Sequence, residues 1–178
     1  METLRKQLKQ LNDEAEQHSL RVASLCKEFA PIENVDETIA ETVGLLHDIG
    51  KIFIPSRILK KNVRLTDLER QMIDLHSYYG YKMLKEAGME KRIYIPVLYH
   101  HGFGKQKLEN IEEAITEEEV RLIRLVHTLD IFDALTCKRV YREAYTIKKA
   151  LNLLYSDELC DEALYEAIRD KYKDDPGL

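Results

Sequence analysis

Histidine and carboxylate residues recur along this sequence of 178 residues, at positions that helical patterns place on inward-facing surfaces. The candidates, from five predicted helices, are Glu14, His18, His47, Asp48, His76, His100, His101 and Asp130. Imidazole and carboxylate groups without thiolates suit iron, manganese, zinc or similar ions, and the set is too large for one ion. The sequence therefore predicts two or three divalent metal ions. Iron or manganese is favoured, with zinc, magnesium, nickel and cobalt as alternatives.

The adjacent pair His47 and Asp48 lies at the centre of this prediction. An apolar helix end delivers the pair, Gly50 stops the helix, and Lys51 adds a cation beside it. We expect Asp48 to bridge the metals, because His47 anchors beside it, and Lys51 to bind phosphate oxygens. Such a cluster can ionise a bridging water and hold the attacking and leaving oxygens of a phosphoryl group. The predicted chemistry is metal-assisted hydrolysis, since the sequence shows neither a Ser-His-Asp arrangement nor a glycine-rich phosphate loop.

Some of these residues also have a plainer interpretation. Glu14 and His18 are neighbours on one helix surface, and they could equally be a solvated charge and a core histidine. Asp130 is more telling, because a carboxylate in an apolar stretch is costly unless it is paired or bound to a metal. His127 lies one turn before Asp130. It could donate to a ligand, contact the substrate, or be a histidine satisfied in the core.

Helical periodicity and capping signals predict the elements that must position these residues. We expect helices over 4–29, 36–47, 66–88, 93–101, from Thr116 past Asp130, 146–155 and 157–172, with a connector at 51–64, a loop at 103–115 and a frayed tail at 173–178. Thr66 with Glu69, and Thr116 with Glu119, have the spacing of capping boxes. In 66–88 the expected buried stripe is Leu68, Met72, Leu75, Tyr79 and Met83, with His76 on the same side. Gly80 should let another backbone approach that face, Gly88 should end the helix, and Pro96 should lie near the start of its helix.

Composition sets the broad class of the protein. Charged residues make up 33% of the chain, but their signs are mixed and the net charge is −5. This argues against a strongly basic surface for duplex nucleic acid and against a polybasic membrane patch. Three widely spaced cysteines are typical of reduced thiols, and no apolar run approaches the length of a membrane span. We therefore expect a single all-α domain over residues 1–178, soluble and cytoplasmic.

Taken together, these residues resemble the HD-domain metal-dependent phosphohydrolases, and more closely the HD-GYP branch of cyclic di-GMP phosphodiesterases. The similar stretches are 18–23, 45–55, 65–76 with Gly80, 100–101 and 130–136, continuing into Arg139, Tyr141 and Arg142, so that the resemblance covers about 14–155. It implies a compact multi-helix HD-type domain in which His18, His47, Asp48, His76, His100, His101 and Asp130 bind metals. It also implies that Glu14 joins them in members with three metals, and that Lys51 lies near the scissile phosphate. Arg139 and Arg142 could bind a phosphate or a guanine edge, or form surface salt bridges.

The sequence departs from that branch after its paired histidines. Gly102 replaces a glutamate, and the segment 103–115 contains no Gly-Tyr-Pro. Three functions therefore remain open: a phosphodiesterase for a cyclic dinucleotide such as cyclic di-GMP, a nucleotide phosphomonoesterase of the 5'-nucleotidase type, and a metal-containing signalling module without catalysis. The expected partners are a phosphorylated nucleotide and either a second copy of the chain or a separate sensor protein.

Overall fold

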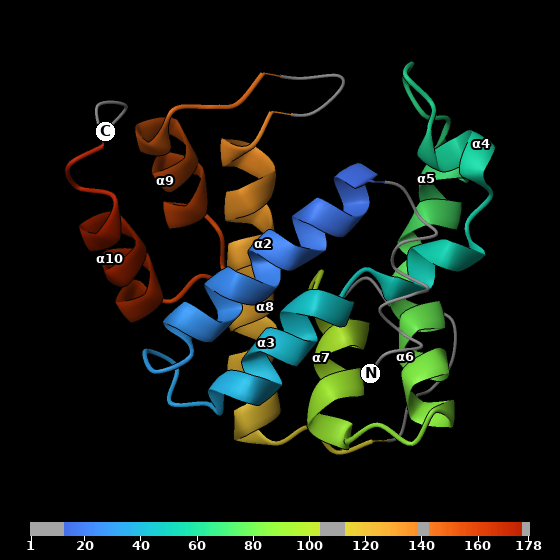
Figure 1. The fold of residues 1–178 in the computed structure, drawn as a ribbon, viewed down its shortest axis with the longest axis horizontal. Coiled ribbons are helices and arrows are strands. Elements are labelled where there is room, and N and C mark those ends of the chain that lie inside the picture. Colours follow the sequence, from blue (N-terminus) through green and yellow to red (C-terminus); the bar gives the residue numbers. More distant parts are fainter. Residues whose placement is uncertain (1–12, 104–112, 139–142, 176–178) are drawn as a thin grey trace.

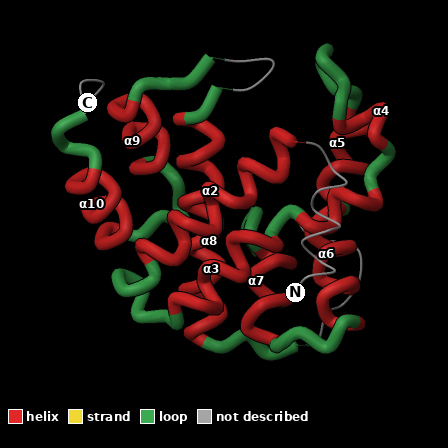
Figure 2. Tube along the Cα trace, viewed as in Figure 1, coloured by secondary structure: helices red, strands yellow, loops and turns green. Residues whose placement is uncertain are grey.

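The computed structural model describes residues 13–103, 113–138 and 143–175, and the regular structure within these ranges is helical throughout (Figure 2). The elements are α2 (Asp13–Phe29), α3 (Glu37–Leu46), the 3-10 helix η1 (Ile49–Phe53), α4 (Ser56–Leu59), α5 (Asp67–Asp74), α6 (His76–Glu86), α7 (Lys91–Tyr99), α8 (Glu117–Thr136), α9 (Ile147–Tyr155) and α10 (Glu162–Lys171). The all-α prediction is confirmed. No helix in these ranges combines the length and apolar character needed to cross a membrane.

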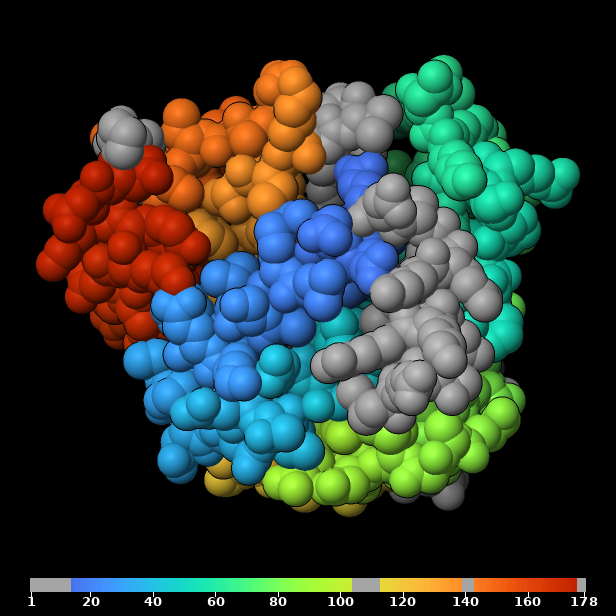
Figure 3. Space-filling model, viewed as in Figure 1, coloured from blue at the N-terminus to red at the C-terminus, as the bar shows by residue number. Residues whose placement is uncertain are grey.

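Helix α8 lies at the centre, and α2, α3, α7 and α9 all pack against it (Figure 1). Figure 3 shows one face of the molecule, where α2 and α3 cover the middle, with α9 and α10 on one side and the segment around α4 on the other. The main core joins these helices through fully buried side chains such as Val22, Leu46, Val126, Leu129 and Leu154. Burial of these apolar groups from distant segments holds together the helices that carry the candidate ligands.

Both predicted capping boxes are present. The Thr66 hydroxyl accepts from the backbone N–H of Glu69, and the Glu69 carboxylate accepts from the backbone N–H of Thr66. Thr116 and Glu119 form the same reciprocal pair at the start of α8. Each box satisfies helix N–H groups that would otherwise lack partners, so these helix starts are determined locally.

The single helix expected over 66–88 is wrong, because the chain forms two helices that meet at Leu75. Leu75 keeps helical torsion angles (φ −66, ψ −15). The sequence over 70–79 contains no glycine or proline that would mark a break at this point. The expected stripe fails in α5, where Leu68 is 73% and Met72 39% exposed and no residue is buried, but in α6 Tyr79 and Met83 pack half-buried against the apolar clusters. In α6 the buried side includes His76 as expected, together with Tyr78 and other residues that the stripe did not include. The predicted stop is confirmed, since Gly88 follows the end of α6 with φ +71.

Two glycines bring η1 onto the backbone of α6. A Cβ added to Gly50 would lie 2.0 Å from the carbonyl oxygen of His76 and 2.5 Å from the backbone nitrogen of Gly80. The expectation that Gly80 allows a close backbone approach is therefore confirmed. This contact places the segment after Asp48 directly against the first turn of α6, which carries His76.

The remaining differences are local. The last helix begins at Glu162, with Asp161 as its N-cap, and not at Asp157, because residues 157–160 form a turn. The connector 51–64 contains the end of η1 and all of α4. Pro96 lies inside α7 and not near its start. Residues 4–12 of the first predicted helix, most of the loop 103–115 and the end of the predicted tail fall outside the described ranges.

Candidate metal centre

Six of the predicted ligands form two groups of three. His18, His47 and Asp130 make one group, and His76, His100 and His101 make the other. Within each group, the potential ligand atoms all lie within 4.8 Å of one another. Three nitrogen or oxygen ligands that converge in this way make up most of the coordination shell of a divalent ion.

Asp48 lies between the two groups, with one carboxylate oxygen toward each. Its Oδ1 lies 3.2 Å from Nε2 of His76, in the second group. Its Oδ2 lies 3.4 Å from Nε2 of His47 and 3.9 Å from Nε2 of His18, in the first group. This position is compatible with a carboxylate that bridges two metal ions, and the bridging role of Asp48 stays a prediction.

Helix ends supply most of these ligands. His47 follows the last residue of α3, and His76 is the first residue of α6. His100 is the C-cap of α7, and His101 lies just beyond it. Two adjacent side chains inside a helix would point about 100° apart, but this limit does not apply past the helix end. The ring centroids of His100 and His101 lie 3.9 Å apart. The paired histidines can face one site because that site lies past the end of the helix.

Three histidines are anchored in the same way. Nδ1 of His47, His76 and His100 lies 2.7, 2.6 and 2.7 Å, respectively, from the carbonyl oxygen of the residue three positions earlier. A carbonyl oxygen only accepts, so each Nδ1 is the protonated donor and each Nε2 presents a lone pair. This fixes the tautomer and the ring orientation needed for metal binding through Nε2.

Among these Nε2 atoms, that of His76 has one possible donor, the hydroxyl of Ser77 at 3.4 Å. Nε2 of His47 is buried without a hydrogen-bond partner. Nε2 of His76 lies 3.2 Å from Nε2 of His100 and 3.3 Å from Nε2 of His101. Buried acceptors that face one another, or nothing, cost free energy unless a cation lies between them. The residues present therefore fit a metal cluster.

The electrostatics of the centre agree with this assignment. Burial raises the pKa of Asp48, but the ammonium group of Lys51 opposes burial, and the pKa lies well below its usual value. Burial, with neighbouring histidines, lowers the pKa of His100 well below its ordinary value and that of His101 to about 3. At neutral pH these imidazoles are neutral and the carboxylate is charged, which are the forms that bind metals.

His18 behaves differently because it faces two carboxylates. Its Nε2 lies 3.0 Å from Oδ1 of Asp130, and its Nδ1 lies 2.7 Å from Oδ2 of Asp133. Burial lowers the pKa of His18, but Asp130 and Asp133 outweigh burial and raise it to about 9. Without a cation at Nε2, His18 is protonated at neutral pH, so a metal bound there displaces a proton.

Asp133 and Arg21 are functional candidates that the sequence prediction missed. Asp133 accepts from His18 and also from Arg21, whose Nε and Nη2 donate at 2.7 and 2.9 Å. A bidentate arginine fixes the carboxylate, and the carboxylate fixes the ring of His18. The available signal was the equal spacing, since His18 with Arg21 and Asp130 with Asp133 are each three residues apart on a helix.

His127 holds the backbone of a candidate ligand. Its Nδ1 lies 2.6 Å from the carbonyl oxygen of His100, and its Nε2 lies 3.1 and 3.2 Å from the two carboxylate oxygens of Asp157. His127 is buried and does not line the pocket beside the centre. Of the three roles that the sequence left open, the geometry argues against a substrate contact and is compatible with both a donor to a ligand and a histidine satisfied in the core.

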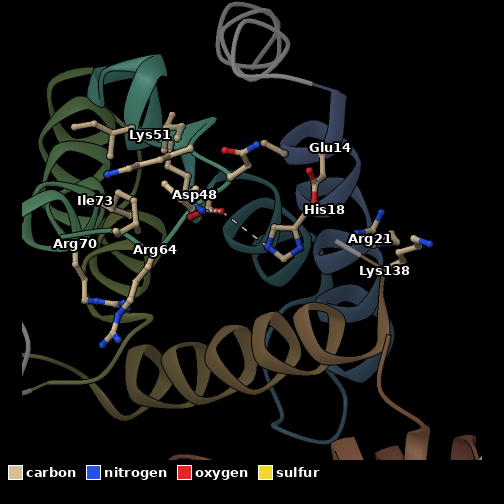
Figure 4. A pocket seen from close by; sticks show the side chains of 16 residues that line it. Glu14, His18, Arg21, Asp48, Lys51, Arg64, Arg70, Ile73 and Lys138 are labelled. Atoms are coloured by element: carbon tan, nitrogen blue, oxygen red, sulfur yellow. Dashed lines mark hydrogen bonds and ion pairs between the residues drawn. The ribbon is translucent and has the colours of Figure 1, made fainter. Parts of the chain in front are cut away.

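A pocket of about 580 Å³ opens beside the centre, with Asp48 and His18 in its wall (Figure 4). Lys51 lies in this wall, and its Nζ donates to Oδ2 of Asp48 at 2.5 Å. Glu14 is exposed, lines the same pocket one turn before His18, and belongs to neither ligand group. The predicted contacts Arg139 and Arg142 lie outside the described residues.

Comparison with known proteins gives one family and several relatives. A family model, HD domain, matches residues 16–137. The cyclic di-GMP phosphodiesterase response regulator RpfG of Xanthomonas campestris pv. campestris is 32% identical over 154 residues, which are 80% of this chain and 40% of that protein. The 3'3'-cGAMP-specific phosphodiesterase 3 of Vibrio cholerae is 32% identical over 157 residues, which cover 85% of this chain and 32% of that protein. This chain therefore spans less than half the length of these relatives.

A solved structure supports the fold. The HD domain of the L. monocytogenes phosphodiesterase PgpH, in complex with cyclic-di-AMP, matches with a TM-score of 0.67 over 94% of this chain and 92% of that chain. The two sequences are 22% identical. At this identity the similarity establishes the arrangement of helices and nothing beyond it.

Proposed function

This chain belongs to the HD domain family, and on that premise we propose that it is a metal-dependent phosphodiesterase acting on a cyclic dinucleotide such as cyclic di-GMP. The observation that carries the proposal is the position of Asp48, whose two oxygens face two separate groups of metal ligands. The resemblance to the HD-GYP branch agrees with the relatives, whose names state activity on cyclic di-GMP and on 3'3'-cGAMP.

The two groups of candidate ligands support a site for two ions. His18, His47 and Asp130 would hold one, His76, His100 and His101 would hold the other, and Asp48 would be shared. Such ions, when bound, supply positive charge for the phosphoryl oxygens and lower the pKa of a bound water. We favour iron or manganese, because the ligands are imidazoles and carboxylates without thiolate. Glu14, at the pocket wall, is the proposed ligand for a third ion.

The other site residues bind the substrate or orient the metal ligands. Lys51 projects from η1 into the pocket beside Asp48, where its ammonium group can bind a non-bridging phosphate oxygen. Arg21 and Asp133 hold His18 in one orientation, and His127 holds the backbone of His100. Arg139 and Arg142 remain proposed substrate contacts, on the resemblance alone. We place this activity in the cytoplasm, where a sensor domain or partner protein would regulate it.

The test begins with protein purified without added metal. Elemental analysis should find about two or three metal ions per chain, as the candidate ligands predict. The same sample, loaded with iron or manganese, should convert cyclic di-GMP or 3'3'-cGAMP to a linear dinucleotide or to mononucleotides. Absence of turnover with every metal would remove the phosphodiesterase proposal.

The missing Gly-Tyr-Pro segment favours a second candidate, a nucleotide phosphomonoesterase. Release of inorganic phosphate from nucleoside monophosphates, with cyclic dinucleotides left intact, would select this function. Tight binding of a nucleotide or partner without turnover, unchanged in Asp48→Ala, would instead select a signalling module. The same purified sample serves for all three measurements.

A further inference from the structure

The pocket beside the metal centre is strongly basic. Six of its lining residues carry positive charge: Arg21, Lys51, Lys61, Arg64, Arg70 and Lys138. Four of them have a carboxylate partner, in the pairs Arg21–Asp133, Lys51–Asp48, Lys61–Glu69 and Lys138–Glu143. The side chains of Arg64 and Arg70 have no ion pair or hydrogen bond to any residue in the described ranges, although the backbone N–H of Arg70 donates to the carbonyl oxygen of Thr66. Glu14 and Asp48 also line the pocket, so Arg64 and Arg70 are the lining cations left without a carboxylate partner among the described residues.

Arg64 and Arg70 lie together in the pocket. Arg64 belongs to the connector between α4 and α5, and Arg70 lies on α5. Figure 4 shows both arginines on the side of the pocket away from His18 and Arg21, with Asp48 drawn in between. Both arginines are exposed, so solvent screens their mutual repulsion, but neither guanidinium group has a carboxylate partner that would occupy it. An anion between them would offset the repulsion, and guanidinium groups bind phosphate oxygens bidentately.

Part of the pocket lining is apolar. Ile58, Leu59, Val63, Leu65 and Ile73 form this part. Figure 4 shows Ile73 on the same side of the pocket as Arg70 and Lys51. Apolar side chains suit the faces of a nucleobase, and a pocket of about 580 Å³ is large enough for more than a single phosphate. Metal ligands, apolar wall and arginine pair therefore lie in one continuous pocket.

We propose that Arg64 and Arg70 form a second phosphate-binding subsite. A substrate with two phosphate groups joined through nucleosides would place one phosphate at the metal ligands and the other between the two guanidinium groups. The inference rests on the proposed phosphodiesterase function and narrows its substrates to dinucleotides. A nucleoside monophosphate, with its single phosphate at the metal centre, leaves this subsite unused.

The test compares two phosphodiesters in the metal-loaded protein. Cyclic di-GMP carries two phosphates, and bis(p-nitrophenyl) phosphate carries one. In the double variant Arg64→Gln/Arg70→Gln, the ratio of kcat/KM for cyclic di-GMP to that for bis(p-nitrophenyl) phosphate should fall about tenfold, mainly through KM. The variant Arg64→Lys/Arg70→Lys keeps both charges and should recover part of the ratio.

Arg57→Gln is the matched control. Arg57 lies on α4, is exposed, and has no ion pair with any residue that the structure describes, but it does not line the pocket. Its removal should leave the ratio unchanged. Because Arg64 and Arg70 are also exposed, the wild-type KM for cyclic di-GMP should rise with ionic strength more steeply than that of the double glutamine variant.

The outcomes separate the two proposals. If the wild type hydrolyses both compounds and the double glutamine variant keeps the wild-type ratio, the subsite is overturned and the phosphodiesterase proposal stands. If the wild type hydrolyses neither, the phosphodiesterase proposal fails, and calorimetric binding decides the subsite. Equal affinity of wild type and variant for cyclic di-GMP would overturn it, and about tenfold weaker binding by the variant would support it.

Discussion

Asp48 illustrates how one residue joins two groups of ligands. Its side chain is buried, Lys51 helps to hold its pKa low, and its two oxygens face different histidines. An asparagine of the same shape lacks the charge, and only one of its two terminal atoms can bind a metal. The shape of the site and its ability to bridge two metals can therefore be separated by a single substitution.

We predict that Asp48→Asn lowers the metal content by at least one ion per chain and reduces phosphodiesterase turnover at least about 100-fold. Elemental analysis and a hydrolysis assay on the same sample measure both effects. Asp170→Asn, at an exposed position on α10, is the control and should match the wild type. Full metal content and full turnover in Asp48→Asn would exclude the bridging role.

Asp133 is a second single residue with a testable role, because it orients the ring of His18. Replacing it with asparagine keeps the volume but removes the charge that Arg21 fixes and that orients the ring of His18. We expect Asp133→Asn to weaken metal binding about tenfold or more, because partners that orient a ligand contribute about that much. Competition with a chelator of known affinity measures the change. Equal metal affinity in variant and wild type would mean that His18 needs no such support.

At the scale of elements, the contact between η1 and α6 positions Asp48 relative to His76. Gly50 permits it, because any side chain there would overlap the carbonyl oxygen of His76. The sequence suggested a close approach at Gly80, but the partner segment could be identified only from the packed structure. The break at Leu75 was missed for a related reason, since α6 turns to pack on η1 and α7 while the local torsion angles stay helical.

Gly50→Ala should destabilise the protein strongly, because the overlapping atoms belong to the backbone and cannot move aside. Gly88→Ala provides the comparison: its Cβ meets nothing within 4 Å, and only its positive φ costs about 1 kcal/mol. Thermal unfolding should show a clearly larger decrease in Tm for Gly50→Ala than for Gly88→Ala. Equal decreases would contradict the close contact between η1 and α6.

A second link between elements involves Glu33, in the turn between α2 and α3. Glu33 is 4% exposed, its Oε1 lacks a hydrogen-bond partner, and burial, together with the carboxylate of Asp161 at the start of α10, raises its pKa to about 7. The folded pKa therefore exceeds the unfolded one, which is about 4.3. The folded protein binds the proton more tightly, so this stabilisation is complete below the unfolded pKa and is lost as pH rises through 7.

Glu33→Gln removes that titration and serves as the test. The Tm of Glu33→Gln minus that of the wild type should increase between about pH 4.5 and pH 7.5, since only the wild type must ionise a buried acid. Thermal unfolding followed by circular dichroism across this range measures the difference. A difference that is constant with pH would show that Glu33 titrates normally in the folded protein.

At the scale of the whole molecule, the candidate ligands connect elements that are far apart in the sequence. They come from α2, the end of α3, the start of α6, the end of α7 and α8. A metal ion bound by residues from several helices stabilises the folded state, because the unfolded chain cannot present the same ligands together. The metal centre should therefore contribute to global stability as well as to chemistry.

Chelation should accordingly lower the Tm of the whole domain in one cooperative transition, and addition of iron or manganese should restore it. Calorimetry of metal-free and metal-loaded protein measures the shift, with Asp48→Asn as the variant in which the shift should shrink. An identical Tm in both states would mean that the ligand groups are held together by apolar packing alone.

The sequence by itself determined the helical class, the starts of α5 and α8 through their capping boxes, and the chemical type of the ligands, because caps and periodicity depend on neighbours within a few residues. Only the tertiary structure decided which ligands belong together. His18 and Asp130 are separated by more than a hundred positions, yet their ligand atoms lie 3.0 Å apart. The same packing brought Arg64 and Arg70 into one pocket, and no local pattern encodes a contact that depends on how distant helices bury their apolar faces.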